Sequence, residues 1–96
     1  MTETKTNSTK EYVFLLFVSA NSILSIRAIK NCREILEEKL KDMYSLEVID
    51  IYEHPDRVIQ EQIITTPILI KKHPLPEIKI TGDLSETAKV IKELLI

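Results

Sequence analysis

The run YVFLLFVS, residues 12–19, contains no charged residue and is rich in aromatic and β-branched side chains. A strand of this composition is buried on both of its faces. It belongs in the middle of a sheet that other elements cover on both sides. The sequence therefore predicts a layered α/β domain with helices packed on the two faces of one sheet.

A long amphipathic helix and a second strand follow this run. From Ser22 to about Asp42, apolar residues recur at steps of three and four positions, as they do on the buried face of a helix. The residues expected to face the core are Ile26, Ile29, Cys32, Leu36 and Leu40. LEVIDIY, residues 46–52, predicts the next strand. A strand, a helix and a strand in this order form a right-handed crossover between parallel strands.

The rest of the chain predicts shorter elements. HPDRVIQEQI, residues 54–63, indicates a short helix that begins with a proline. PILIK, residues 67–71, and EIKIT, residues 77–81, predict two strands joined as an antiparallel hairpin. DLSE, residues 83–86, has the pattern of a capping box for a last helix. The residues expected to bury that helix are Leu84, Ala88, Ile91 and Leu95.

The predicted order is β-α-β-α-β-β-α, which is the order of the thioredoxin-like fold. In that fold a cis proline opens the third strand, beside the loop that follows the first strand. We therefore expect the Thr66–Pro67 bond to be cis, and the alternative is a trans proline that simply starts an edge strand. Gly82 is the only glycine of the chain. Because glycine tolerates positive φ, it is expected to turn the chain ahead of Asp83.

Size and charge limit the classes of function. A chain of 96 residues makes one small domain, expected over residues 11–96 after a polar, disordered leader at residues 1–10. The formal net charge of −2 lacks the basic excess of most nucleic-acid-binding proteins. The single cysteine cannot form an internal disulfide bond, and no apolar run is long enough to span a membrane. These features predict a cytoplasmic protein that binds neither nucleic acid nor membrane.

The residues predict no catalytic, cofactor-binding or metal-binding site. ANSILS, residues 20–25, occupies the position where thioredoxin-like proteins usually carry Cys-x-x-Cys, and Ser22 is expected to cap the helix there. Cys32 lies on the inward stripe and is interpreted as a small buried hydrophobe, with weak redox work as the alternative. His54 and His73 lack the spacing of a metal site. A binding module is the remaining interpretation.

The ordered segments resemble the KaiB family of circadian-clock proteins. The resemblance covers about residues 12–95, and its most specific parts are IITTPILIKK, residues 63–72, and ITGDLSE, residues 80–86. YVFLLFVS, SIRAIKNCREILEEKL and YSLEVIDIYEHP match at the corresponding spacings. The spacer KKHPLPE lacks a run of three prolines, and SANSIL replaces a glycine-containing loop. These departures suggest a member outside the core cyanobacterial clock.

The resemblance implies a regulator that is not an enzyme. Its expected partner is a KaiC-like hexamer, a RecA-type ATPase and kinase, and it implies modulation of that hexamer in circadian timing or stress adaptation. A KaiA-like protein or a histidine kinase is a possible further partner, and the resting state is expected to be a dimer or tetramer. The resemblance also implies fold switching. The half from about Ile51 onward is expected to rearrange, with Pro67, Gly82 and Asp83 at the changing turns.

Arg27 and Lys30 are the first candidates for contact with the KaiC-like partner. Both project away from Ile29 and Leu36, so the core does not need them, and solubility is the alternative explanation of their charge. A second hypothesis is a thioredoxin-like module that binds glutathione or a peptide through the Pro67 loop. A third is the sensor domain of a clock-linked histidine kinase.

Overall fold

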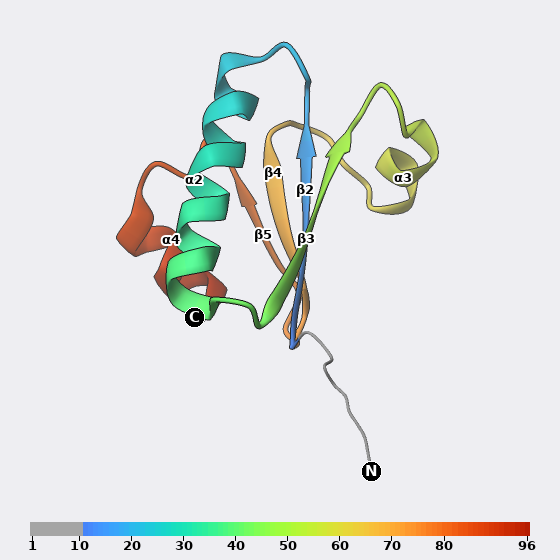
Figure 1. The fold of residues 1–96 in the computed structure, drawn as a ribbon. Coiled ribbons are helices and arrows are strands. Elements are labelled where there is room, and N and C mark those ends of the chain that lie inside the picture. The colour runs from blue at the N-terminus through green and yellow to red at the C-terminus, as the bar shows by residue number, and fades with distance from the viewer. Residues whose placement is uncertain (1–10) are drawn as a thin grey trace.

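The computed structural model of the protein describes residues 11–96, so the predicted leader at residues 1–10 lies outside the described residues. Four strands and three helices follow one another along the described chain in the predicted order, β-α-β-α-β-β-α (Figure 1). Their bounds are β2 (Tyr12–Val18), α2 (Ile23–Leu40), β3 (Tyr44–Asp50), α3 (Pro55–Gln60), β4 (Ile68–His73), β5 (Ile78–Thr81) and α4 (Thr87–Leu94). Every predicted element is present, with ends displaced by a few residues.

The four strands form one mixed sheet in the order β3-β2-β4-β5. β2 pairs in parallel with β3 and antiparallel with β4, and β4 pairs antiparallel with β5. In Figure 1, α2 and α4 lie on one face of the sheet and α3 lies on the other. The run at residues 12–19 is therefore a central strand covered on both sides, as predicted, and the fold is thioredoxin-like.

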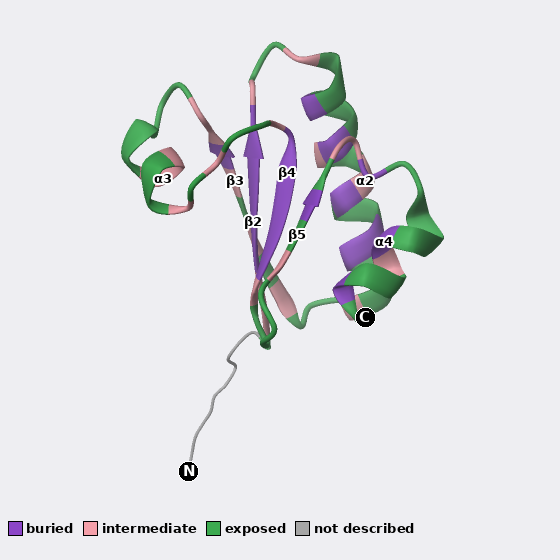
Figure 2. Ribbon diagram, turned by 180° about the vertical axis from the view of Figure 1, so that it is seen from behind, coloured by how far each residue is buried: buried purple, intermediate pink, exposed green. Residues whose placement is uncertain are grey.

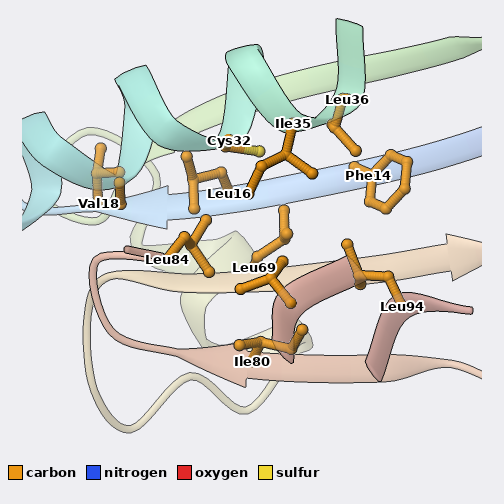
Figure 3. Packing of buried hydrophobic residues seen from close by; sticks show 12 residues of the cluster. Phe14, Leu16, Val18, Cys32, Ile35, Leu36, Leu69, Ile80, Leu84 and Leu94 are labelled. Carbon is orange, nitrogen blue, oxygen red and sulfur yellow. The ribbon is translucent and has the colours of Figure 1, made fainter. Parts of the chain in front are cut away.

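The face under α2 and α4 carries the larger core. Its buried side chains come from β2, α2, β4, β5, α4 and the segment before α4. Figure 3 shows Cys32, Ile35 and Leu36 of α2 pointing toward the β2 side chains, with Leu84 and Leu94 closing the other side. The buried positions in Figure 2 follow this face along both helices. Apolar burial of this kind is the main source of stability for so small a domain.

The face under α3 carries a smaller core, which includes Leu15, Phe17 and Ile49 and against which Val58 packs. Ion pairs at its rim hold α3 in place. Arg57 of α3 makes a bidentate pair with Glu47 on β3. Hydrogen bonding to Arg57 lowers the pKa of the Glu47 carboxyl.

Lys72 on β4 bonds both carboxylate oxygens of Glu61, just beyond α3, at 3.1 and 3.2 Å. These polar contacts accompany limited burial, since no residue of α3 is fully buried.

The buried face of α2 differs in part from the predicted stripe. Cys32 and Leu36 are buried as expected, and Ile29 and Leu40 pack partly against the core. The expectation for Ile26 is wrong, because its side chain is 57% exposed. The additional buried positions of the helix are Ser25, Ala28 and Ile35. The buried face of the helix therefore includes Ser25 and Ala28, two small residues that a search for large apolar side chains passes over.

The predicted capping box at residues 83–86 is wrong. α4 begins at Thr87, and its N-cap residue Glu86 makes no side-chain capping bond. Asp83 instead accepts a hydrogen bond from the backbone N–H of Ser85 at 3.0 Å, which closes a turn before the helix. Leu84 is buried as expected, but from this turn and not from the helix. Because α4 starts later, its buried residues are Val90 and Leu94, while Ala88 and Leu95 are exposed.

Candidate functional site

Pro67 and Gly82 meet at the end of the sheet. The Thr66–Pro67 bond is cis, as predicted. The backbone N–H of Gly82 donates to the carbonyl oxygen of Pro67 at 3.0 Å, directly beyond the paired residues Ile68 and Thr81. Gly82 has φ +103°, and a Cβ atom placed there would meet open space. The glycine is therefore required for its backbone conformation and not for close packing.

Asp83 connects this junction to α2. Its backbone carbonyl accepts a hydrogen bond from the Asn31 side-chain amide at 2.8 Å. The pKa of its carboxyl is lowered, first by hydrogen bonds from the Ser85 side chain and backbone and then by the positive charge of Arg27. Asn31 and Arg27 lie on the same helix. The three predicted switch positions thus lie together beside α2. We call Pro67, Gly82 and Asp83, with Asn31 and Arg27 of α2, the seam.

Arg27 and Lys30, the two predicted partner contacts, are both exposed on α2. Lys30 pairs with Glu34 one turn along the helix at 3.0 Å, and both side chains stay largely in solvent. A pair this exposed stabilises the fold little, by about 0.3–0.5 kcal/mol. Arg27 faces Asp83 closely enough to lower its pKa, whereas Lys30 does not contribute to that shift. Of the two basic residues, Arg27 is therefore the one whose charge acts on the Asp83 carboxyl.

Apolar side chains surround Arg27 on the surface. Ile23 is 66% exposed and Leu24 is 48% exposed, and Ile26 lies beside them in the first turns of α2. We call Ile23, Leu24, Ile26, Arg27 and Lys30 the α2 patch. The sequence did not indicate the apolar members of this patch, and the helical period placed Ile26 in the core. Three large hydrophobic side chains are exposed within four consecutive positions of α2.

The loop after β2 holds hydroxyl groups where a redox thioredoxin would hold cysteines. Ser22 caps α2 through its side chain, as predicted, by accepting from the backbone N–H of Ser25 at 3.3 Å. The Ser19 and Thr66 hydroxyls lie 3.1 Å apart, and Ser25 accepts from the Ser19 N–H at 2.9 Å. These groups bond one another and link the loop to the residue before Pro67.

Cys32 is buried in the middle of α2, as predicted. Desolvation raises the pKa of its thiol to about 12. The reactive species in thiol chemistry is the thiolate, which is almost absent at neutral pH for a thiol with such a pKa. The residue therefore acts as part of the core.

Within residues 11–96, no group of three or more His, Cys, Asp and Glu side chains is arranged to hold a metal ion. His54 precedes α3 and His73 ends β4, so neither joins the seam. No helix in the described part of the chain is long and apolar enough to cross a membrane.

Comparison with known proteins decides the family. The KaiB domain model matches residues 15–95. The chain belongs to the KaiB family. The circadian clock protein KaiB3 of Synechocystis sp. is 44% identical over 79 residues, which cover 82% of this chain and 78% of that protein. The circadian clock oscillator protein KaiB of Rippkaea orientalis is 42% identical over 85 residues, covering 88% and 82% of the two chains.

Solved structures support the thioredoxin-like arrangement of this KaiB-family chain. The N-terminal domain of SasA from Synechococcus elongatus superposes with a TM-score of 0.72 at 22% identity, covering 99% of this chain and 93% of that domain. Mitochondrial thioredoxin 3 from Saccharomyces cerevisiae superposes with a TM-score of 0.71 at 14% identity, covering 91% and 80%. At these identities the likeness concerns the fold alone. The family itself is one of clock regulatory proteins, and its match indicates no catalytic family.

Proposed function

We propose that this protein regulates a KaiC-like hexamer, a RecA-type ATPase and kinase, by binding to it as a thioredoxin-like monomer. Its role is to alter the phosphorylation or ATPase state of the hexamer, in circadian timing or in stress adaptation. The observation that carries the proposal is the KaiB domain match over residues 15–95, together with clock-protein relatives above 40% identity. One of these relatives is named circadian clock protein KaiB3, and similarity to it is compatible with a role outside the core clock.

The α2 patch is the proposed contact surface. Its apolar side chains are exposed beside two basic residues, and none of these five is needed to fill the core. Apolar anchors near the centre of an interface supply most of the binding energy, whereas charges at its rim direct the approach of the partner. The patch also lies next to the seam through Arg27 and Asp83. A rearrangement of residues 51–96 would therefore change the surroundings of the patch, and binding would depend on the fold.

Binding can be measured with purified cognate KaiC-like protein in the presence of ATP. We expect capture of the hexamer by the wild-type chain, and we expect Ile26→Asp to weaken the affinity by tenfold or more, about 1.4 kcal/mol. The double change Arg27→Glu and Lys30→Glu should weaken it through slower association, increasingly so at low salt. Lys39→Glu is the matched control, because Lys39 is an exposed lysine near the other end of the same helix.

Two results would contradict the proposal at different levels. Failure of the wild-type chain to bind any cognate KaiC-like hexamer would contradict the function. Unchanged affinity in the Ile26 variant and in the double variant would leave the partner in place and remove the α2 patch as its contact surface.

The second part of the proposal is that residues 51–96 exchange between two topologies. Pro67, Gly82 and Asp83 lie at the seam where this half meets α2, which is where a rearranging half must detach. A dimer or tetramer at rest, and a KaiA-like protein or a histidine kinase as a further partner, are predictions of the same proposal. Two sets of NMR peaks in slow exchange test the two topologies, and sedimentation velocity on the same sample tests the dimer or tetramer.

The alternative is a thioredoxin-like module that binds glutathione or a peptide at the Pro67 loop. The paired hydroxyls of Ser19 and Thr66 beside Pro67 favour it, because hydroxyl groups can hydrogen-bond the backbone of an extended peptide. Calorimetric titration with glutathione, followed by Thr66→Val, tests this alternative. Insulin reduction should be absent in either case, because the Cys32 thiol is buried. Activity lost on Cys32→Ser would contradict that expectation.

A further inference from the structure

Lys71 on β4 is a charged residue inside the larger core. It is 1% exposed and ranks among the largest fully buried side chains of the protein. Along β4 it follows Leu69 by two positions, so both side chains point to the face under α2 and α4. Its neighbours across the sheet are Phe14 on β2 and Ile78 on β5, and both belong to or pack on that core.

The amine of Lys71 meets the end of α4. Nζ donates to the carbonyl oxygen of Leu94, the last residue of that helix, at 3.2 Å. Terminal carbonyls of a helix lack intrahelical partners and carry partial negative charge, so this contact is favourable. An ammonium group, however, has three donors. Within residues 11–96, the ion pairs of the structure do not include one for Lys71.

The next residue shows the contrast. Lys72 points to the opposite face, stays partly exposed and pairs with the carboxylates of Glu61 and Glu77. Two adjacent lysines on one strand therefore stand in opposite environments. Lys72 keeps both water and counter-charges, whereas Lys71 has one carbonyl and an apolar enclosure.

We propose that Lys71 keeps the docking of α4 close to balance, so that the end of the chain detaches from the sheet more readily than its apolar packing alone would allow. Taking an ammonium group out of water without a counter-charge costs more than one hydrogen bond to a carbonyl returns. α4 has only eight residues, too few for a helix that is stable by itself, and it buries Val90 and Leu94. Docking of α4 encloses the amine, and detachment returns the amine to water.

The consequence for partner binding rests on the proposed function. If residues 51–96 exchange between two topologies, the amine of Lys71 shifts their ratio toward the state in which it reaches water. The effect on α4 itself needs no partner and no second topology. It is a property of the isolated chain, so the two claims can fail separately.

Hydrogen exchange of the α4 amides tests the inference, because it measures local opening. Lys71→Met keeps an unbranched side chain of similar length and removes the charge. We expect exchange of the α4 amides to slow by about tenfold, which corresponds to about 1.4 kcal/mol. Lys89→Met is the matched control, since Lys89 is exposed on the same helix, and it should leave exchange nearly unchanged.

A second variant separates the charge from the hydrogen bond. Lys71→Gln keeps a donor for the Leu94 carbonyl but carries no charge, so it should also slow exchange. Exchange as fast as wild type or faster in both variants, or a failure of both to fold, would overturn the inference. Slower exchange in a chain that captures no KaiC-like hexamer would sustain the role of Lys71 and contradict the proposed function instead.

Discussion

The two halves of the chain are built differently. Residues 11–50 form two seven-residue strands and an eighteen-residue helix, whereas the elements of residues 51–96 are four to eight residues long. Of the four non-glycine residues with positive φ in the described chain, Lys41 is in the first half. Gln62, Leu84 and Leu95 are in the second half, together with Gly82. The first half is regular because its own sequence specifies long elements, and the second half takes its shape from contacts.

Those contacts are made largely with the first half. β4 pairs with β2 along its length, and Leu84, Val90 and Leu94 enter the core that β2 and α2 begin. Asn31 holds the Asp83 carbonyl, and Ser19 bonds Thr66. A half that is short of internal structure but fits a preformed surface can detach without destroying that surface. This difference is the physical basis for proposing that residues 51–96 are the part that rearranges.

The largest expected effect comes from the centre of the first half. Leu16 on β2 is fully buried, so Leu16→Ala should lower the free energy of unfolding by about 3–4 kcal/mol through lost burial and a residual cavity. Because both halves pack on β2, they should unfold in one transition. Urea unfolding followed by circular dichroism measures the change, with the half-exposed Leu24→Ala as control. A loss below about 1 kcal/mol would mean that β2 is not the common support.

A smaller and more local effect is expected in the second half. Leu84 is buried in the turn before α4, and Leu84→Ala should lower the free energy of unfolding by about 2 kcal/mol. Amides in residues 82–96 should exchange faster while those of α2 keep their protection. Leu75→Ala is the control, because Leu75 is exposed in the β4–β5 connection. Equal loss of protection across both halves would contradict the idea that they differ in independence.

The sequence predicted most of the fold because long patterns are reliable. The buried run at residues 12–19 identified the central strand, and Ser22 marked the start of α2. The order of the seven elements then predicted the thioredoxin-like fold, and that fold predicted the cis bond at Pro67. The contact between Pro67 and Gly82 joins residues fifteen positions apart, which no local pattern indicates.

Sequence reasoning failed where a tertiary contact overrode a local signal. DLSE reads as a cap, but burial of Leu84 pulls the chain into a turn with φ 63° and delays the helix to Thr87. Ile26 fits a helical stripe, yet Ser25 and Ala28 fill the narrow space against the sheet. Lys71 is a charged residue at the end of an apolar run, and nothing in the sequence indicated that its side chain would be buried under α2 and α4. The two errors, the capping box and Ile26, occur at the seam and in the α2 patch, both of which are proposed to function.

Gly82→Ala should have an intermediate effect. The residue has φ +103° with open space around it, so an alanine is strained only through its backbone, by about 1 kcal/mol. The free energy of unfolding of the thioredoxin-like form should fall by that amount, whereas Thr81→Ala, at an exposed neighbour, should have little effect. The resemblance to KaiB implies that the same substitution favours the thioredoxin-like form over a second topology, which requires the second topology to be destabilised by more than this amount. NMR peak volumes report that ratio, and a single peak set in both proteins would contradict the switch.

The smallest expected effect concerns Arg27 in the first half, whose charge acts on Asp83 in the second half. Hydrogen bonds from Ser85 and then the charge of Arg27 lower the pKa of Asp83. A carboxyl with a lowered folded pKa contributes stability above its unfolded value of about 3.9, and that contribution is lost as pH falls through the folded pKa.

Arg27→Gln should therefore raise the pKa of Asp83 slightly, and Ser85→Ala should raise it more because Ser85 is the larger cause. Lys30→Gln is the control, since Lys30 pairs with Glu34 and is not a cause of the shift. NMR titration of the Asp83 side chain between about pH 2 and 6, the range in which carboxyl groups usually titrate, measures its pKa in each of the three variants. An unchanged pKa in Arg27→Gln would mean that α2 and the seam are electrostatically independent. The α2 patch would then keep its surroundings whichever way residues 51–96 fold, and the proposed dependence of binding on the fold would lose its electrostatic link.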